Sequence, residues 1–396
     1  MSLPRWARQI LINSTITQGV IYIVRPMITY RALELDASPT MIGVIAALYA
    51  LLPVLFALSF GRWVGTLGEG RFVILGTASM SLAAGLLVFA QSIPLLAVAA
   101  ALSGLSHLAC MVGGQTLVSL RSPNDQYEKY FGYYTFSASL GQMLGPIIAV
   151  LVAGSTGVIP KSTTTAFAVA AIFAIAALIP IMNWRNEEPT VRAAQREEGA
   201  LRSAGSLLKN RKIFSAIYTS MAISSVGDIL VVFLPLLGNE KSFSAFSIGV
   251  IIAIRAGASM LSRIYLGKLS EKFATERILV VSTIISLTAC AAMAFASNVY
   301  LLAIIVVIAG FALGVGQPLT MSMVSLATAP EDRALAVSAR LTGNRFGQFI
   351  LPAGAGVLAS SSGTSAVIHI QRCLEHPQGQ SWREFLQIAG CVDDGL

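Results

Sequence analysis

The feature that most constrains this chain is a succession of apolar runs, each close to the about 20 residues with which an α-helix crosses a bilayer. Asp, Glu, Lys and Arg make up only 12% of the 396 residues, against roughly 25% in ordinary soluble domains. The runs do not alternate polar and apolar residues, as the strands of a membrane barrel do. The sequence therefore predicts an all-α membrane protein and argues against a soluble globule.

Hydropathy predicts eleven membrane-spanning helices in this chain. The polar stretch 184–212 separates a six-helix half at residues 1–183 from a five-helix half at 213–360, and residues 361–396 form an atypical polar tail. In chain order, the predicted helices lie at residues 9–30, 40–60, 72–90, 93–117, 131–153, 164–182, 213–237, 246–266, 278–296, 299–323 and 335–358.

The two predicted halves repeat one sequence pattern at a constant offset of 206 residues, at which residues 42–45 recur as residues 248–251. A constant register from the second predicted helix to the last indicates a duplicated unit, as in many secondary transporters. The same offset pairs Gly61 with Gly267, Arg71 with Arg277, Gly104 with Gly310, Gly141 and Gln142 with Gly347 and Gln348, and Pro146 with Pro352.

The repeat places a twelfth helix at about residues 370–388, where the sequence does not support one. Arg372, Glu375, Arg383 and Glu384 lie there, and each charge opposes insertion by about 2.5–3.5 kcal/mol. We hypothesise that the tail is a truncated or frame-shifted form of a twelfth helix.

Lys and Arg predict the orientation of the chain, because basic residues in short loops resist translocation. One set of loops is basic, and the other holds only Arg31, Lys161 and Lys241. We therefore expect the N-terminus and the central loop to be cytoplasmic. The basic set holds Arg5, Arg8, Arg62, Arg71, Arg121, Lys129, the central loop, Lys268, Lys272, Arg277, Arg333 and Arg340.

Two of the basic loops share a motif that resembles the loop signature of the major facilitator superfamily. Glycine there lets two helix ends approach closely, and the acidic and basic residues can form an ion-pair latch that breaks when the halves rock. The second copy follows the family pattern with Glu for Asp, whereas the first has Gly65 at the acidic position. The motif residues are Gly61, Gly68 and Arg71 in the first copy and Gly267, Glu271, Lys272 and Arg277 in the second.

The predicted helix 131–153 is similar to the signature helix of the drug and metabolite antiporters of that superfamily. Its small residues permit close helix packing, and its proline allows a kink. The family also often carries an Arg four residues before a Gly in the fourth helix, where this chain has Ala100 before Gly104. The matching residues are Gly132, Gly141, Gly145 and Pro146.

Ionisable residues predicted at membrane depth are the candidates for substrate or proton coupling, because burying them is costly. Asp228 is the candidate proton carrier, with Arg255 as its partner, either in transport or in a structural ion pair, and Arg345 is a second charge in the cavity. We expect Arg25 and Arg263 to reach the two membrane surfaces.

Neutral and titratable polar residues near these charges are further candidates. His107 could titrate near neutral pH or be a hydrogen-bonded core residue. Asn344, Gln142 and Gln348 offer neutral hydrogen bonds.

The resemblance implies a major facilitator fold with a midplane site that opens alternately to each side. We expect a monomeric secondary transporter of the bacterial inner membrane that exports a small molecule in exchange for protons. Uptake or exchange of an anionic metabolite and a truncated, non-transporting copy are the alternatives. No enzyme motif, cofactor, metal site or nucleic-acid partner is expected.

Overall fold

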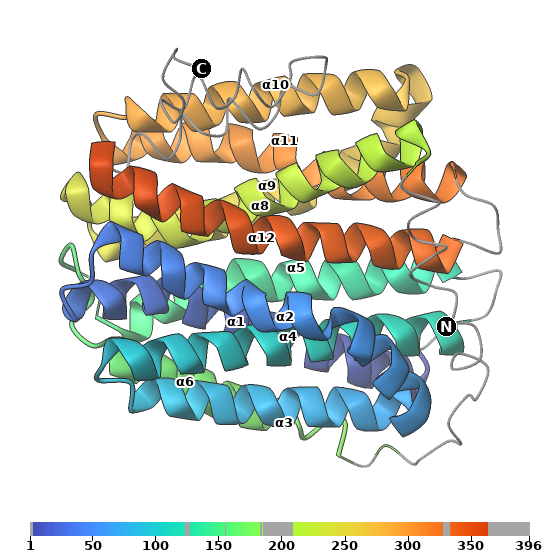
Figure 1. The fold of residues 1–396 in the computed structure, drawn as a ribbon, viewed down its shortest axis with the longest axis horizontal. Helices are drawn as coiled ribbons and strands as arrows, with labels where there is room; N and C mark the ends of the chain where they lie inside the picture. Colours follow the sequence, from blue (N-terminus) through green and yellow to red (C-terminus); the bar gives the residue numbers. More distant parts are fainter. Residues whose placement is uncertain are drawn as a thin grey trace, which may run out of the picture.

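The computed structural model describes residues 3–122, 127–154, 156–182, 184, 209–327 and 333–362, which fold into one bundle of helices. Figure 1 shows the helices lying side by side along the long axis of the molecule. Seven of the described helices are long and apolar enough to cross a membrane. The all-α prediction is therefore confirmed. In chain order the helices are α1 (Arg5–Glu34), α2 (Pro39–Leu67), α3 (Glu69–Val88), α4 (Ile93–Arg121), α5 (Tyr127–Val152), α6 (Thr163–Ala176), α8 (Arg211–Glu240), α9 (Ala245–Lys272), α10 (Thr275–Ala294), α11 (Val299–Leu326) and α12 (Arg333–Ser362).

Each of these eleven helices overlaps one predicted from hydropathy, several extend past the predicted bounds, and one is shorter than predicted. The helix predicted at 164–182 ends at Ala176, and the chain continues to residue 182 in turns. Pro180 has no N–H to donate and restricts the residue before it, so the helix does not continue through this point. Residues 185–208 and 363–396 lie outside the described part of the chain, and what we expect of them stays a prediction.

Side-chain caps begin several helices at the same end of the bundle. Ser38 accepts from the backbone N–H of Met41 at the start of α2, and Ser244 accepts from that of Ser247 at the start of α9. A capping oxygen satisfies one of the backbone donors that a helix start leaves without a partner. Ser38 and Ser244 are related by the repeat offset, so the duplication includes the signals that start the helices.

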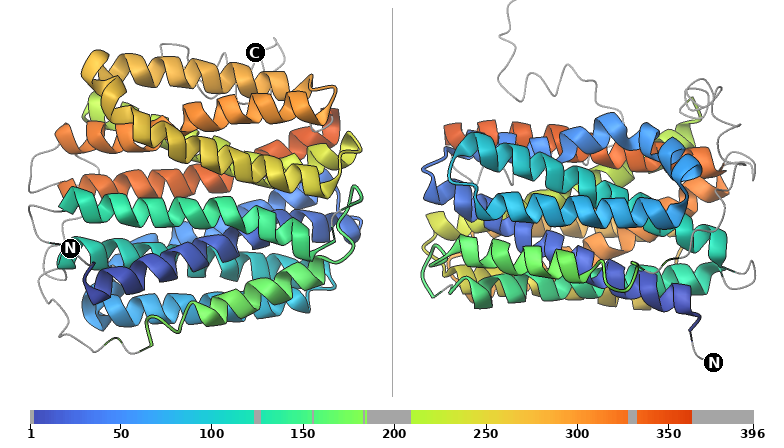
Figure 2. Two further views of the ribbon diagram at one scale, coloured as in Figure 1. Left: turned by 180° about the vertical axis from the view of Figure 1, so that it is seen from behind. Right: turned by 90° about the horizontal axis from the view of Figure 1, so that it is seen from below.

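The helices form two groups, α1–α6 and α8–α12, that meet along three helix pairs. α2 packs on α12, α5 on α9 and α1 on α8. In Figure 1 the outer helices α3 and α10 lie at opposite edges of the bundle, and Figure 2 shows the same arrangement from behind and from below. Transporters of this architecture bind their substrates between the two groups, so we expect the transport site on this surface.

The same backbone contacts occur in both groups at the repeat offset. A Cβ atom added to Gly104 would overlap Tyr49 O, and one added to Gly310 would lie 2.6 Å from Arg255 O. At the offset of 206 residues, Tyr49 corresponds to Arg255 and Gly104 corresponds to Gly310. The offset found in the sequence thus corresponds to equivalent helix crossings, α2 with α4 and α9 with α11.

The tightest approach of α1 and α5 occurs at two glycines of the antiporter-like motif. A Cβ on Gly141 would overlap Thr15 O, and one on Gly145 would lie 2.6 Å from Gly19 O. A Cβ on Gly132, in contrast, would meet no atom within 4 Å. Two of the motif's glycines are therefore required by packing, and Gly132 is not.

We expect Gly141→Ala to lower the thermal unfolding midpoint of the purified protein, because overpacking against backbone costs about 1–3 kcal/mol. Gly132→Ala is the matched control. It should leave the midpoint unchanged or raise it, since alanine favours a helix over glycine by up to about 1 kcal/mol. Equal destabilisation by both variants would contradict this packing.

Candidate transport site between the two helix groups

One buried ion pair joins α1 to α8. Arg25 Nη1 lies 2.5 Å from Asp228 Oδ1, and the two side chains are only 8% and 14% exposed. One helical turn further along, Thr29 Oγ1 donates to Val232 O at 3.1 Å. Charges removed from water in this way are stable only with a partner and further polar contacts. This pair therefore fixes α1 against α8.

The ion pair corrects two predictions. The partner of Asp228 is Arg25 and not Arg255, and Arg25 lies inside the protein instead of reaching the membrane surface. The reason is that α1 crosses α8 at this depth, so the guanidinium meets a carboxylate before it can meet water. Nothing in the sequence relates two residues that lie 203 positions apart.

A chain of polar contacts continues from Arg25 into the first helix group. The guanidinium carbon of Arg25 lies 4.8 Å from the centre of the Tyr49 ring, within the range of a cation–π contact. Tyr49 Oη lies 2.8 Å from His107 Nδ1, and His107 Nε2 lies 3.1 Å from Gln18 Nε2. Since the amide nitrogen of Gln18 only donates, His107 Nε2 accepts, and Nδ1 carries the proton and donates to Tyr49.

The last members of this chain are positioned by the glycine contacts between α1 and α5. Gln18 precedes Gly19 and Gln142 follows Gly141, so the close approach of the two backbones brings the two amides together. Gln142 Nε2 donates to Gln18 Oε1 at 3.3 Å. We call Asp228, Arg25, Tyr49, His107, Gln18 and Gln142 the polar chain.

Arg345 lies on the other side of the polar chain, in α12. It is 9% exposed and close enough to Tyr49, Asp228 and Arg25 to interact with them electrostatically. Its Nη1 donates to Gln348 Oε1 at 3.0 Å, and its Nη2 lies 3.1 Å from Met111 Sδ in α4. The neighbouring Asn344 is buried, and its Oδ1 has no hydrogen-bond partner among the described residues.

Three more arginines lie inside the second helix group. Arg255 is 7% exposed, and its Nε has no hydrogen-bond partner. Arg263, which we expected at the membrane surface, instead donates to Ser139 Oγ in α5 at 3.1 Å. Arg340, expected among the loop residues, is buried and donates to Ser220 Oγ at 2.7 Å. Helix α9 extends to Lys272, past its predicted end at residue 266, so Arg263 lies deeper than expected. Arg340 is buried because α12 packs on α8 at this point.

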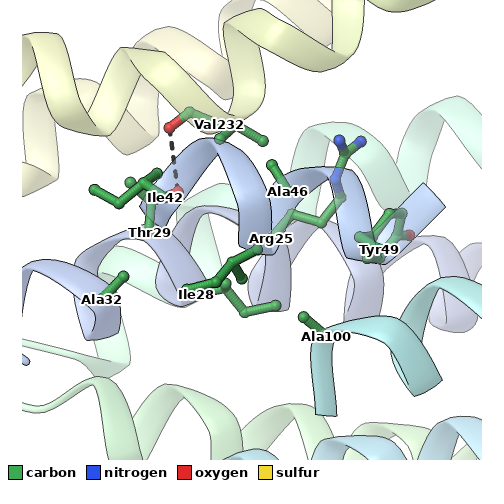
Figure 3. Close-up of a pocket in the computed structure, with 10 residues that line it drawn as sticks. Arg25, Ile28, Thr29, Ala32, Ile42, Ala46, Tyr49, Ala100 and Val232 are labelled. Carbon is green, nitrogen blue, oxygen red and sulfur yellow. Dashed lines mark hydrogen bonds between the residues drawn. The ribbon is translucent and has the colours of Figure 1, made fainter. Parts of the chain in front are cut away.

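A small pocket lies beside the ion pair, between α1, α2, α4 and α8. Figure 3 shows Arg25 and Tyr49 at its polar side, with Ile28, Thr29 and Ala100 around it. Ala100 is the position at which the resembling antiporters often carry an arginine. In this chain the arginine that lines the pocket comes from α1. The remaining lining residues are Ala32, Ile42, Ile45, Ala46 and Val232.

The two loop motifs are less regular than the sequence pattern suggests. Gly68 joins α2 to α3 with a backbone φ of +84°, a conformation that favours glycine. The adjacent Glu69 forms an ion pair with Arg121 of α4 at 3.2 Å, which ties helices of one group together. Glu271 and Lys272 of the second copy are exposed and form no ion pair among the described residues. Among the described residues, the ion pair beside the first motif therefore lies within one helix group, and the latch between the groups stays a prediction.

Sequence reasoning missed three members of the polar chain. Arg25 was assigned to the membrane surface, and Gln18 and Tyr49 were not considered. One signal could have found two of them: Gln18 and Arg25 lie two helical turns apart on the first helix, in a segment that otherwise reads as apolar. Polar residues at that spacing share a face, and a face that avoids lipid is a face between helices.

A bundle of apolar helices in two repeated groups, with buried charges between them, defines a multi-pass membrane transporter. The family model of the Major Facilitator Superfamily matches residues 10–299 and 228–373. The chain therefore belongs to this superfamily, as the loop motifs and the helix 5 motif suggested.

Characterised relatives are resistance proteins of bacteria. The tetracycline resistance protein, class B, of Escherichia coli is 26% identical over 321 residues, which cover 78% of this chain and 77% of that protein. The multidrug resistance protein MdtG of Dickeya zeae (strain Ech586) is 26% identical over 289 residues, which cover 71% of this chain and 68% of that protein.

Solved structures share the fold at low sequence identity. A mutant form of the nucleoside transporter NupG has a TM-score of 0.78 at 12% identity, covering 93% of this chain and 97% of that chain. A bacterial homologue of the human lysosomal transporter Spinster, inward-facing and unoccupied, has a TM-score of 0.73 at 16% identity, covering 91% and 84%. These likenesses support the fold alone.

The ion pair predicts a non-additive effect on stability. Asp228→Leu should destabilise the purified protein, because removing one partner of a buried pair costs about 3–5 kcal/mol, whereas apolar replacement of both partners is close to neutral. The double variant Arg25→Met with Asp228→Leu should therefore recover most of the loss. Thermal unfolding in detergent measures this, with Glu271→Gln as the control at an exposed carboxylate. If the double variant lost as much stability as Arg25→Met and Asp228→Leu lose together when measured singly, the ion pair would be ruled out.

Proposed function

We propose that this protein exports a small molecule across the bacterial inner membrane in exchange for protons, by alternating access. The observation that carries the proposal is the Arg25–Asp228 pair, which joins the two helix groups through charge. Asp228 is the one acidic residue away from the helix ends in the described part of the chain. A proton on Asp228 would remove one charge of the pair and weaken the contact between α1 and α8.

The position of the Arg25–Asp228 pair along the bundle supports a role for it in closing one side of the transporter. Arg25 and Asp228 lie nearer the end of the bundle that carries the turn 35–38, where Ala245 N also donates to Gly157 O between the two groups. By the distribution of Lys and Arg, this end is the outward one. We therefore assign the described conformation to the state that is closed to the outside, and proton binding at Asp228 to the opening of that side.

The direction of substrate transport in this proposal is argued from the relatives. Both characterised relatives are named as resistance proteins, for tetracycline and for several drugs. Resistance by a membrane transporter is achieved by export. An exported molecule that competes with a proton for Asp228 couples its own exit to proton entry, since the two occupy the carboxylate in turn.

A second candidate, uptake or exchange of an anionic metabolite, is favoured by the excess of buried arginines. Arg255, Arg263 and Arg345 have no carboxylate partner among the described residues. A bound anion would stabilise a proton on Asp228, so proton and anion would move in the same direction. The direction of proton movement therefore separates the two candidates.

We expect Asp228→Asn to abolish substrate-driven proton movement, because an amide does not take up the proton at physiological pH. The measurement uses inside-out vesicles with an imposed proton gradient and a pH-reporting dye, to which cationic drugs, neutral sugars and organic anions are added in turn. Collapse of the gradient by a cationic or neutral compound, absent in Asp228→Asn, supports exchange.

The control variant is Asp36→Asn, which neutralises an exposed carboxylate at a backbone φ of +53° that asparagine tolerates. It should retain the full response. A response to organic anions only would favour the second candidate. No response to any compound, in vesicles that contain the protein, would indicate a non-transporting copy and end the proposal.

A further inference from the structure

Arg255 is a buried cation without a counter-charge. Its side chain is 7% exposed, it makes no hydrogen bond or ion pair among the described residues, and its Nε is completely buried. Arg263, which carries the same charge, is close enough to interact with it electrostatically. A guanidinium in this position is destabilising, and it is retained in functional proteins where something else supplies the counter-charge.

The fold holds Arg255 in place and directs its guanidinium toward α8. Its backbone is fixed by the close approach of α11, because a Cβ on Gly310 would lie 2.6 Å from Arg255 O. Its guanidinium is directed toward α8, where a Cβ on Gly227 would meet only Arg255 Nη1, at 3.9 Å. Gly227 and Asp228 are both partly exposed. The guanidinium therefore lies beside Gly227, one residue away from the acid of the ion pair.

Among the described residues, no carboxylate forms an ion pair with Arg255. The adjacent carboxylate, Asp228, is bound by Arg25. Arg345, the next buried cation, is itself held only by the neutral Gln348 and Met111. The region around Asp228 thus holds several guanidinium groups and a single carboxylate, and its electrostatic potential is positive.

We propose that the exported molecule is a zwitterion whose anionic group, a carboxylate or a similar oxyanion, binds Arg255 while its cationic group binds Asp228. This inference rests on the proposed function and adds the substrate class. An oxyanion is the group that guanidinium binds best, through charge-assisted and often bidentate hydrogen bonds. The cationic group is needed because it displaces the proton of Asp228, whereas a simple anion would retain that proton and reverse the coupling.

Binding of three small probes tests the substrate class. The probes are para-(aminomethyl)benzoate, a zwitterion, para-toluate, which lacks the cation, and para-methylbenzylammonium, which lacks the anion. Titration calorimetry of the purified protein should give an affinity for the zwitterion about tenfold or more above that for either singly charged probe, as expected for one added charge-assisted contact. The meta isomer of the zwitterion repeats the test at a shorter charge separation.

Two variants assign the contacts. Arg255→Met should remove the advantage of the zwitterion over the ammonium probe without weakening the ammonium probe itself. Asp228→Asn should remove its advantage over para-toluate. Arg211→Gln, at an exposed position at the start of α8, should change neither. If neither zwitterion binds better than the singly charged probes, or no probe binds at millimolar concentration, the inference is wrong.

These outcomes separate the substrate class from the proposed function. Proton movement driven by a cationic compound, without any preference for zwitterions, would leave proton exchange standing and reject the substrate class. A preference for zwitterions that depends on Arg255, without proton movement in vesicles, would keep the substrate class and reject proton exchange.

A measurement without any ligand tests the same residue. If Arg255 is a ligand-binding group, Arg255→Met should raise the thermal unfolding midpoint of the empty protein, because it removes an unpaired buried charge. If Arg255 instead stabilises the fold, Arg255→Met should lower the thermal unfolding midpoint. A lower midpoint in the variant would therefore overturn the assignment of Arg255 to the substrate.

Discussion

The contact between Arg25 and Asp228 is the interaction on which the arrangement of the two helix groups depends. The Arg25 side chain is 8% exposed and that of Asp228 14%, and among the described residues neither forms another ion pair. Separating α1 from α8 would therefore leave two charges without partners in a region of low dielectric, which is far more costly than losing an exposed pair. Once a proton or a substrate group occupies the carboxylate, that cost falls. In the proposed cycle, a chemical event at one side chain thereby becomes a movement of two helix groups.

The position of this pair depends in turn on residues that carry no charge. Gly141 and Gly145 let α5 approach α1 closely enough for Gln142 to reach Gln18, and Gln18 fixes the tautomer of His107. His107 then holds the hydroxyl of Tyr49, whose ring lies against the guanidinium of Arg25. Small residues at helix crossings thus determine where a charged side chain can lie.

The sequence predicted the fold well because a membrane leaves few choices. Backbone groups in hydrocarbon must be satisfied within a helix, so apolar runs such as 299–323 locate helices directly, here α11. The site was predicted only in part. Asp228 was recognised as a buried acid, but its partner depends on the rotation and crossing of α1 against α8, which hydropathy does not contain. By depth Arg255 was the expected partner and Arg25 was assigned to the membrane surface, and only the packing of the helices shows that Arg25 binds the carboxylate.

Duplication explains how a nearly symmetric fold acquired an asymmetric site. Tyr49 and Arg255 are equivalent under the repeat offset, and each has its backbone held by the equivalent glycine, Gly104 or Gly310. In the first helix group this position carries a neutral ring that supports Arg25. In the second it carries a guanidinium that forms no ion pair with any described residue. Because the backbone is fixed in both copies, a change of side chain alters charge without altering geometry. The repeated architecture therefore supplies two matched positions, and the difference between their side chains gives the transport site its polarity.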